Sequence, residues 1–212
     1  MKSILCYGDS NTFGENPEGG RHPRNIRWTG ILQKLLGEDY YIIEEGLNGR
    51  TTVFEDPLET CRNGAEALPF VLKSHKPLDL VLIMLGTNDC KTHFALTATG
   101  IANGLERLVR MILHFDYGNS CKIPEIFIVS PIHIGDNAKE RPASNFEDQS
   151  VVRSKGLAAE YERVAKAYGC RFFDASTVAV PSRTDQIHMD ADNHRALAGA
   201  LAAELKNWSE GK

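Results

Sequence analysis

The chain has 212 residues, of which 42 % are hydrophobic and 25 % are charged, and its 24 Lys and Arg against 28 Asp and Glu give a formal net charge of −4. This composition is typical of a folded globular protein and excludes a mainly disordered chain. The longest apolar run, 80–85, is far shorter than the roughly 20 residues that a transmembrane helix requires, so no membrane partner is expected. Without a long basic run, the net negative charge also argues against nucleic acid as a partner.

The length fits a single domain over residues 1–212, because α/β domains commonly exceed the ~150-residue average. The N-terminal residues lead directly into polar Gly8-Asp9-Ser10-Asn11, without the apolar stretch and cleavage site of a secretory signal, so we expect a cytoplasmic protein. Five cysteines, an odd number without a C-x-x-C pair or metal-ligand spacing, indicate reduced and mostly buried thiols.

Strand-like and helix-like segments alternate along the chain. Short apolar or β-branched runs predict five strands, at residues 3–7, 41–45, 80–85, 125–129 and 171–173. Apolar residues at helical spacing predict four helices, around residues 28–36, 101–112, 157–168 and 197–208. Parallel strands need crossover connections, and helical crossovers cover both faces of a sheet. The expected fold is therefore α/β, a three-layer α/β/α sandwich around a doubly wound five-stranded parallel sheet.

Two segments, 14–27 and 131–145, are long for connections in such a fold. Long ordered loops are uncommon and often functional, so both are candidates for pocket walls, lids or subunit contacts. Surface decoration is the alternative interpretation.

Polar residues follow four of the predicted strands. In an open parallel sheet, ligands bind beyond the carboxyl ends of the strands, so these segments are the first place to look for a site. The four segments begin at Gly8, Gly46, Gly86 and Asp185. We expect all four to lie at one edge of the sheet.

Ser10 follows a strand and a turn, where its hydroxyl could stand exposed as a nucleophile. Serine is also a preferred helix N-cap, which is the structural alternative. A serine hydroxyl needs a base within hydrogen-bond reach, usually a histidine that a carboxylate holds in place. Asp185 and His188, three residues apart, can supply that pair: Asp185 would accept from Nδ1 and leave Nε2 facing Ser10.

Two other interpretations of Asp185 and His188 stay open. Asp185 could merely cap a turn. Alternatively, the segment could hold a metal ion, although alternate residues on one short segment do not usually converge on one ion. Such a cluster would comprise Asp185, His188, Asp190, Asp192 and His194.

Acyl transfer also needs hydrogen-bond donors for the oxyanion of the tetrahedral intermediate. The backbone N–H groups of Ser10 and Gly49 and the side-chain amide of Asn88 could converge on one point. Two of these residues also have a purely structural interpretation: Gly49 could be only a turn glycine, and Asn88 only a turn-capping residue. Asp89 is assigned to loop structure.

With its residues in this order, the chain resembles the SGNH (GDSL-type) hydrolase superfamily, serine esterases and lipases on a flavodoxin-like sandwich. The four family blocks match at Gly8-Asp9-Ser10-Asn11, Gly49, Gly86-Thr87-Asn88-Asp89 and Asp185 to His188. The resemblance covers the whole chain and implies an acyl-Ser10 intermediate, a small-molecule ester substrate, and no metal or organic cofactor.

The segments 44–52 and 85–89, with the 14–27 loop, look like the bacterial arylesterase and acyltransferase branch of that superfamily. This branch implies short-chain (acetyl-type) and aryl esters as substrates, acyltransferase or perhydrolase side activity, and a homo-oligomer, a tetramer or octamer. Carbohydrate acetylesterase and thioesterase activities stay open, because one fold hosts many substrates.

Apolar side chains near Ser10 are candidates for the pocket walls. Phe13, Trp28 and Phe54 are expected there, unless they are ordinary core or interface residues. Asn11 stands where the family usually has leucine, and we expect it to alter the pocket floor.

A different class of function is a non-catalytic module that binds a phosphate or nucleotide at the turn of residues 8–12, as flavodoxin-like folds do. The chain lacks the Gly-rich phosphate fingerprint and the P-loop lysine, which counts against this alternative.

Overall fold

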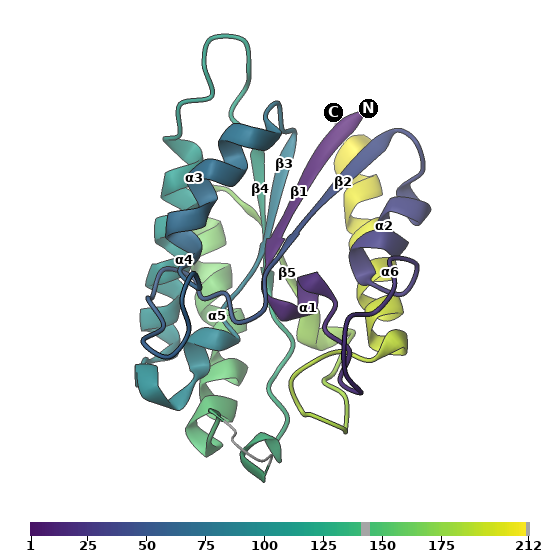
Figure 1. Ribbon diagram of the computed structural model, residues 1–212. Helices are drawn as coiled ribbons and strands as arrows, with labels where there is room; N and C mark the ends of the chain where they lie inside the picture. The colour runs from purple at the N-terminus through teal and green to yellow at the C-terminus, as the bar shows by residue number, and fades with distance from the viewer. Residues whose placement is uncertain (141–144, 211–212) are drawn as a thin grey trace.

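A five-stranded parallel sheet forms the centre of the structure, a computed structural model that describes residues 1–140 and 145–210 (Figure 1). Its strands run side by side in the order β2-β1-β3-β4-β5, and every pair is parallel. The strands are β1 (Lys2–Gly8), β2 (Tyr40–Gly46), β3 (Leu80–Met84), β4 (Glu125–Ser130) and β5 (Arg171–Asp174). All five strands predicted from sequence are confirmed, with small shifts at their ends.

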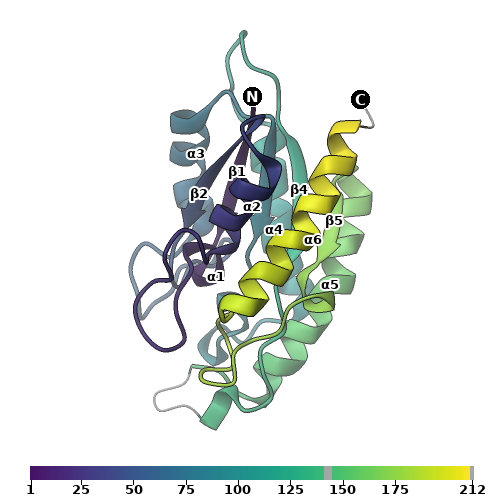
Figure 2. The same ribbon diagram turned by 90° about the vertical axis from the view of Figure 1, so that its right-hand side faces the viewer.

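Helices cover both faces of the sheet, which confirms the three-layer α/β/α sandwich. Figures 1 and 2 show α2 (Trp28–Leu36) and α6 (Ala191–Glu210) on one face. The other face carries α3 (Gly64–His75), α4 (Ala98–Leu113) and α5 (Asp148–Tyr168). Short 3-10 turns and the one-turn helix α1 (Ser10–Phe13) complete the described elements.

The core lies in two layers that share the sheet. Along β1, Leu5 and Tyr7 pack toward α3, α4 and α5, whereas Ile4 and Cys6 pack toward α2 and α6. Every residue of β3, the middle strand, is buried. A strand that is covered on both faces must be apolar throughout, which explains the continuous apolar runs in the sequence.

The helix α3 was not predicted. Pro69 lies inside it and has no N–H to donate to the preceding turn, so this segment lacks an ordinary helical signal. Asn63 compensates at the start by accepting a hydrogen bond from the Ala65 N–H at 3.0 Å. Leu68 and Leu72 then bury the inner side of the helix against the core.

The register of the sheet aligns the carboxyl ends of β1, β2 and β3. Gly8 lies opposite both Gly46 and Met84, so the segments after β1, β2 and β3 begin at one level. Gly46 also lets α1 approach, because a Cβ there would lie 2.0 Å from the backbone nitrogen of Phe13. These segments meet at the end of the molecule remote from both termini (Figure 1).

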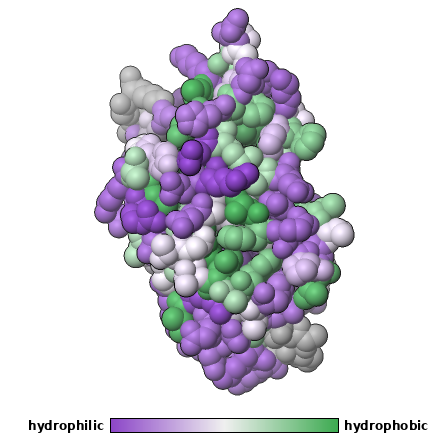
Figure 3. All heavy atoms as spheres, turned by 90° about the vertical axis from the view of Figure 1, so that its left-hand side faces the viewer, coloured by the Kyte–Doolittle hydropathy of each residue, from purple (hydrophilic) through white to green (hydrophobic). Residues whose placement is uncertain are grey.

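The face of the molecule over α3, α4 and α5 is largely polar. Figure 3, which shows the side formed by α3, α4 and α5, has hydrophilic residues around an apolar area. Exposed large hydrophobic side chains include Phe70 of α3 and Val152 of α5. Within the described part of the chain, every helix is too short or too polar to cross a bilayer.

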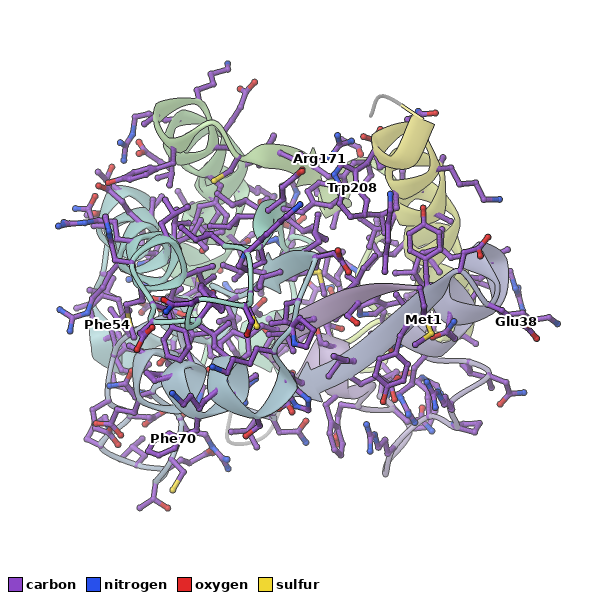
Figure 4. The ribbon with its side chains drawn as sticks, turned by 90° about the horizontal axis from the view of Figure 1, so that it is seen from above. Met1, Glu38, Phe54, Phe70, Arg171 and Trp208 are labelled. Atoms are coloured by element: carbon purple, nitrogen blue, oxygen red, sulfur yellow. The ribbon has the colours of Figure 1, made fainter. Side chains whose placement is uncertain are left out.

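The opposite end of the sheet is closed by the C-terminal helix. In Figure 4 Trp208 lies beside Arg171, between α6 and the start of β5. The Trp208 indole N–H donates to the Glu125 carboxylate at 2.7 Å, which ties the end of α6 to the start of β4.

A buried histidine joins α6 to α2. His194 is fully buried, and its Nδ1 accepts a hydrogen bond from the Trp28 backbone N–H at 3.3 Å. Its ring also contacts that of His22 edge-on, with 5.3 Å between centroids. Burial, reinforced by the nearby His22, lowers the pKa of His194 to about 3.

We predict that His194→Gln changes how stability depends on pH. An unfolded histidine takes up a proton below about pH 6.5, whereas native His194 does not until about pH 3. Acid therefore lowers the wild-type free energy of unfolding relative to the variant, by ~1.4 kcal/mol per pH unit in that window. Urea unfolding of both proteins at pH 8 and pH 5 measures this. The prediction would be wrong if the difference in free energy of unfolding between the wild type and the variant were the same at pH 8 and pH 5.

Candidate active site

Ser10 is the first residue of α1, directly after the turn that ends β1. The cap of this helix is Asp9, whose carboxylate accepts from the Asn11 N–H at 3.0 Å. Gly14 ends the helix in the left-handed region, with its N–H bonded to the Ser10 carbonyl at 2.8 Å. Because Asp9 takes the capping role, the Ser10 hydroxyl is free for another partner.

Asp185, His188 and Ser10 form a continuous chain of hydrogen bonds. The Asp185 carboxylate contacts His188 Nδ1 at 2.5 Å, and His188 Nε2 lies 2.9 Å from Ser10 Oγ. Asp185 also accepts from the backbone N–H groups of Ile187 and His188, at 2.9 and 2.8 Å. Burial alone would raise the pKa of Asp185, but these hydrogen bonds and His188 together lower it. The carboxylate therefore stays ionised and orients the imidazole.

Asn11 fixes the segment that carries the histidine. Its side-chain amide donates to the Ile187 carbonyl at 3.2 Å and accepts from the Met189 N–H at 2.9 Å. These two contacts hold the backbone on both sides of His188. The residue next to the serine thus positions the His188 imidazole, a role that the sequence analysis did not assign to it.

The other acidic and histidine residues of the segment point to separate partners. Asp190 accepts from the Asn193 N–H, Asp192 pairs with Arg195, and His194 faces Trp28. Over the described ranges, no three His, Cys, Asp or Glu side chains gather as a metal site would need.

Two further donors face the same cavity as Ser10, at the ends of β2 and β3. Gly49 adopts φ 76°, in the left-handed region that favours glycine over residues with a Cβ. The Asn88 amide donates one hydrogen to the Arg50 carbonyl at 3.2 Å, which fixes its direction and leaves its second hydrogen unused by that bond.

Buried carboxylates hold the segments that carry these polar groups. Asp89, assigned from sequence to a loop, is fully buried in a 3-10 turn and accepts from the Thr52 N–H and hydroxyl, at 3.0 and 2.5 Å. Burial raises the pKa of Asp89 to about 6 and that of Asp9 also to about 6. Through Thr52, Asp89 fixes the segment that carries Gly49.

A cavity of about 210 Å³ opens beside Ser10. Apart from Ile187 and Phe146, the residues that line it are polar, charged or glycine. They are Ser10, Glu15, Asn48, Gly49, Glu59, Asn88, Lys91, Asn145 and His188. Ser10, Gly49, Asn88 and His188, separate in the sequence, are therefore brought together in one place.

The four expected pocket residues do not line this cavity. Trp28 is fully buried in the core, where its indole donates to the Asn11 carbonyl at 3.1 Å. Phe13 lies under the Arg21 guanidinium, at 4.0 Å from the ring centroid. Phe54 packs near Phe94 at 6.3 Å between centroids, on the α3 and α4 side in Figure 4. Asn11, the fourth, is buried under the histidine segment. The expectation is corrected on this point, because packing and not chain proximity decides what faces a pocket.

Several lining residues were missed by the sequence analysis, although signals for some were present. Glu15 and Asn145 belong to the two long loops that were candidate pocket walls, and Asn48 precedes Gly49 directly. Lys91 follows Asn88 by one helical turn. Residues 141–144 of the second loop lie outside the described residues.

Comparison with protein families gives an independent result. The GDSL-like Lipase/Acylhydrolase family matches residues 6–200 of this chain. Among curated proteins, an acetylxylan esterase of Xylanibacter ruminicola is 25 % identical over 222 residues, covering 96 % of this chain. The chain spans only 43 % of the length of that relative.

Solved structures of similar proteins cover the full length. A carbohydrate acetylesterase family member from Sinorhizobium meliloti is 43 % identical, with a TM-score of 0.90 over 97 % of this chain and 98 % of that one. The native aryl esterase of M. smegmatis is 38 % identical, with a TM-score of 0.90 over 98 % of this chain and 99 % of that one. Both support the same three-layer fold.

We predict that Asn11→Ala slows chemical labelling of Ser10 by a fluorophosphonate by roughly tenfold, because the imidazole is less well placed to accept the hydroxyl proton. Mass spectrometry of the adduct measures the labelling and locates it. Asn63→Ala is the matched control, because it removes a helix cap from α3 without touching the His188 segment. Equal labelling rates in the two variants would show that Asn11 acts on stability alone.

Proposed function

The chain belongs to the GDSL-like lipase/acylhydrolase family, and from this premise we propose that it is a carboxylic ester hydrolase with Ser10 as its nucleophile. The observation that carries the proposal is the line from Asp185 through His188 to Ser10, with contacts of 2.5 and 2.9 Å. Acyl transfer uses such a chain of hydrogen bonds to activate a serine, whereas a serine with only a structural role needs no oriented histidine.

In the proposed first step, His188 Nε2 takes the proton from Ser10 Oγ as the oxygen attacks the ester carbonyl. The carbonyl oxygen becomes an oxyanion, which accepts hydrogen bonds from the backbone N–H groups of Ser10 and Gly49 and from the Asn88 amide. Asp185 stabilises the imidazolium that forms. The bond to the alcohol then breaks, and the leaving oxygen takes the proton from His188.

The second step releases the acid. A water molecule gives its proton to His188 and attacks the acyl-Ser10 carbonyl, and the Ser10 oxygen leaves with that proton. No step uses a metal or an organic cofactor. An alcohol or peroxide in place of water would accept the acyl group by the same route, so acyl transfer is proposed as a side activity.

The size of the cavity supports short acyl chains. Its volume of about 210 Å³ is below the roughly 300–1,000 Å³ of pockets for drug-sized ligands. We therefore propose acetyl-type esters as substrates, including aryl esters. The similar proteins include an aryl esterase and carbohydrate acetylesterases, which is consistent with this range.

The alternative of a phosphate-binding module fits the site less well. A phosphate at the turn of residues 8–12 would meet the Asp9 carboxylate, which already occupies the Asn11 N–H. Phosphate binding would also give no functional role to the contact between His188 and Ser10.

We predict that the protein hydrolyses p-nitrophenyl acetate with a burst of nitrophenol, and that kcat/KM falls from acetate to octanoate because the cavity is small. Ser10→Ala removes the nucleophile and is expected to abolish both burst and turnover at an unchanged melting temperature. Ser74→Ala, an exposed serine of α3, is the control and is expected to keep full activity. Full activity in Ser10→Ala would overturn the proposed function.

We further predict that Asn88→Ala lowers kcat by roughly 10² to 10³ with little change in KM, because the amide acts mainly on the oxyanion. Steady-state kinetics with p-nitrophenyl acetate separates the two parameters. A rise in KM as large as the fall in kcat would instead indicate that Asn88 positions the substrate.

A further inference from the structure

The charged side chains around the cavity differ in whether they have a partner of opposite charge. Lys91 is neutralised by Asp56, whose side chain is fully buried and lies 2.9 Å from Lys91 Nζ. Glu59 pairs with Arg62 at 2.9 Å. Over the described ranges, Glu15 alone among the charged lining residues has only a neutral partner, the Asn48 amide, at 2.7 Å. Among the residues that the structure describes, the wall next to Ser10 therefore carries one negative charge without a cationic partner.

Glu15 and Asn48 form a fixed hydrogen-bonded pair, which we name the Glu15–Asn48 pair. Glu15 is held one turn beyond the nucleophile, because its N–H donates to the Ser10 carbonyl at 3.0 Å. A carboxylate only accepts, so Asn48 must turn its Nδ2 toward Glu15. The Asn48 Oδ1 atom is consequently left buried without a hydrogen-bond partner.

The Glu15–Asn48 pair has chemical consequences for the substrate. Asn48 donates to Glu15 Oε2, which leaves the other oxygen of this cavity-lining carboxylate to accept a further hydrogen bond, whereas Asn48 Oδ1 is closed off. A short alkyl acyl chain has no N–H or O–H to donate, so placing it against the carboxylate would leave that acceptor unpaired at a cost. The alcohol part of an ester can carry such donors.

We propose that the Glu15 carboxylate, held in place by Asn48, is a leaving-group subsite that selects esters of polyhydroxylated alcohols. This inference rests on the proposed esterase function and adds a specificity-determining role to it. A hydroxyl of the alcohol donates to the Glu15 carboxylate while the acyl carbonyl faces the oxyanion donors. The same carboxylate disfavours anionic leaving groups by charge repulsion.

A matched pair of acetate esters tests the subsite. Glycerol 1-acetate and propyl acetate have the same acyl group and three-carbon alcohols, and differ only by two hydroxyls. We expect Glu15→Gln to lower kcat/KM for glycerol 1-acetate by roughly tenfold, because a hydrogen bond to a charged carboxylate becomes a weaker one to a neutral amide. Propyl acetate is expected to change less than twofold. Titration of the released acid measures both esters, and their ratio within each enzyme cancels differences in enzyme concentration.

Glu18→Gln is the control for this experiment, because it makes the same chemical change in the same loop, where the Glu18 carboxylate accepts a hydrogen bond from the Thr184 hydroxyl. An unchanged ratio in Glu15→Gln, or an equal fall for both esters, would overturn the subsite while the esterase function stands. An absence of Ser10-dependent hydrolysis of propyl acetate and p-nitrophenyl acetate would overturn both proposals. Melting temperatures of the three proteins verify that the substitutions leave the fold intact.

Discussion

The parallel register of β1 with β2 and β3 is the constraint on which the site depends. Because Gly8 lies level with Gly46 and Met84, the chain leaves all three strands at one height. Ser10, Gly49 and Asn88 follow within four residues of those strand ends, so three separate segments deliver their polar groups to one cavity. A slip of one residue between any two strands would separate these groups and turn core side chains toward the wrong face.

A second layer of buried polar groups holds those segments rigid. Asp89 grips the backbone and hydroxyl of Thr52, and Arg50 donates to the Gly8 carbonyl at 2.9 Å while its guanidinium lies over the Tyr7 ring. Burial opposes the ionisation of Asp9 and Asp89, as their raised pKa values indicate. These buried carboxylates lower the stability of the fold, but they hold the hydrogen-bond donors beside the cavity in fixed positions.

Sequence patterns were sufficient to predict the strands of the sheet and the polar residues of the site. Both depend on features that are local in the sequence. Alternation of apolar runs identified each strand, and motif spacing placed Asp185 three residues before His188, where the structure has them in contact. The helix α3 escaped because Pro69 removes a helical signal that packing of Leu68 and Leu72 replaces. The walls of the pocket were predicted wrongly because the direction of a side chain depends on tertiary contacts. Trp28 is near Asn11 in space, yet it points into the core.

The position of Asn11 has a mechanical consequence for the whole site. It shares the single turn of α1 with Ser10, and its two hydrogen bonds reach the backbone on either side of His188. Ser10 and the His188 segment are therefore linked twice, through the 2.9 Å contact between Ser10 Oγ and His188 Nε2 and through the side chain of Asn11. A displacement of α1 that separated the hydroxyl from the imidazole would have to break both links.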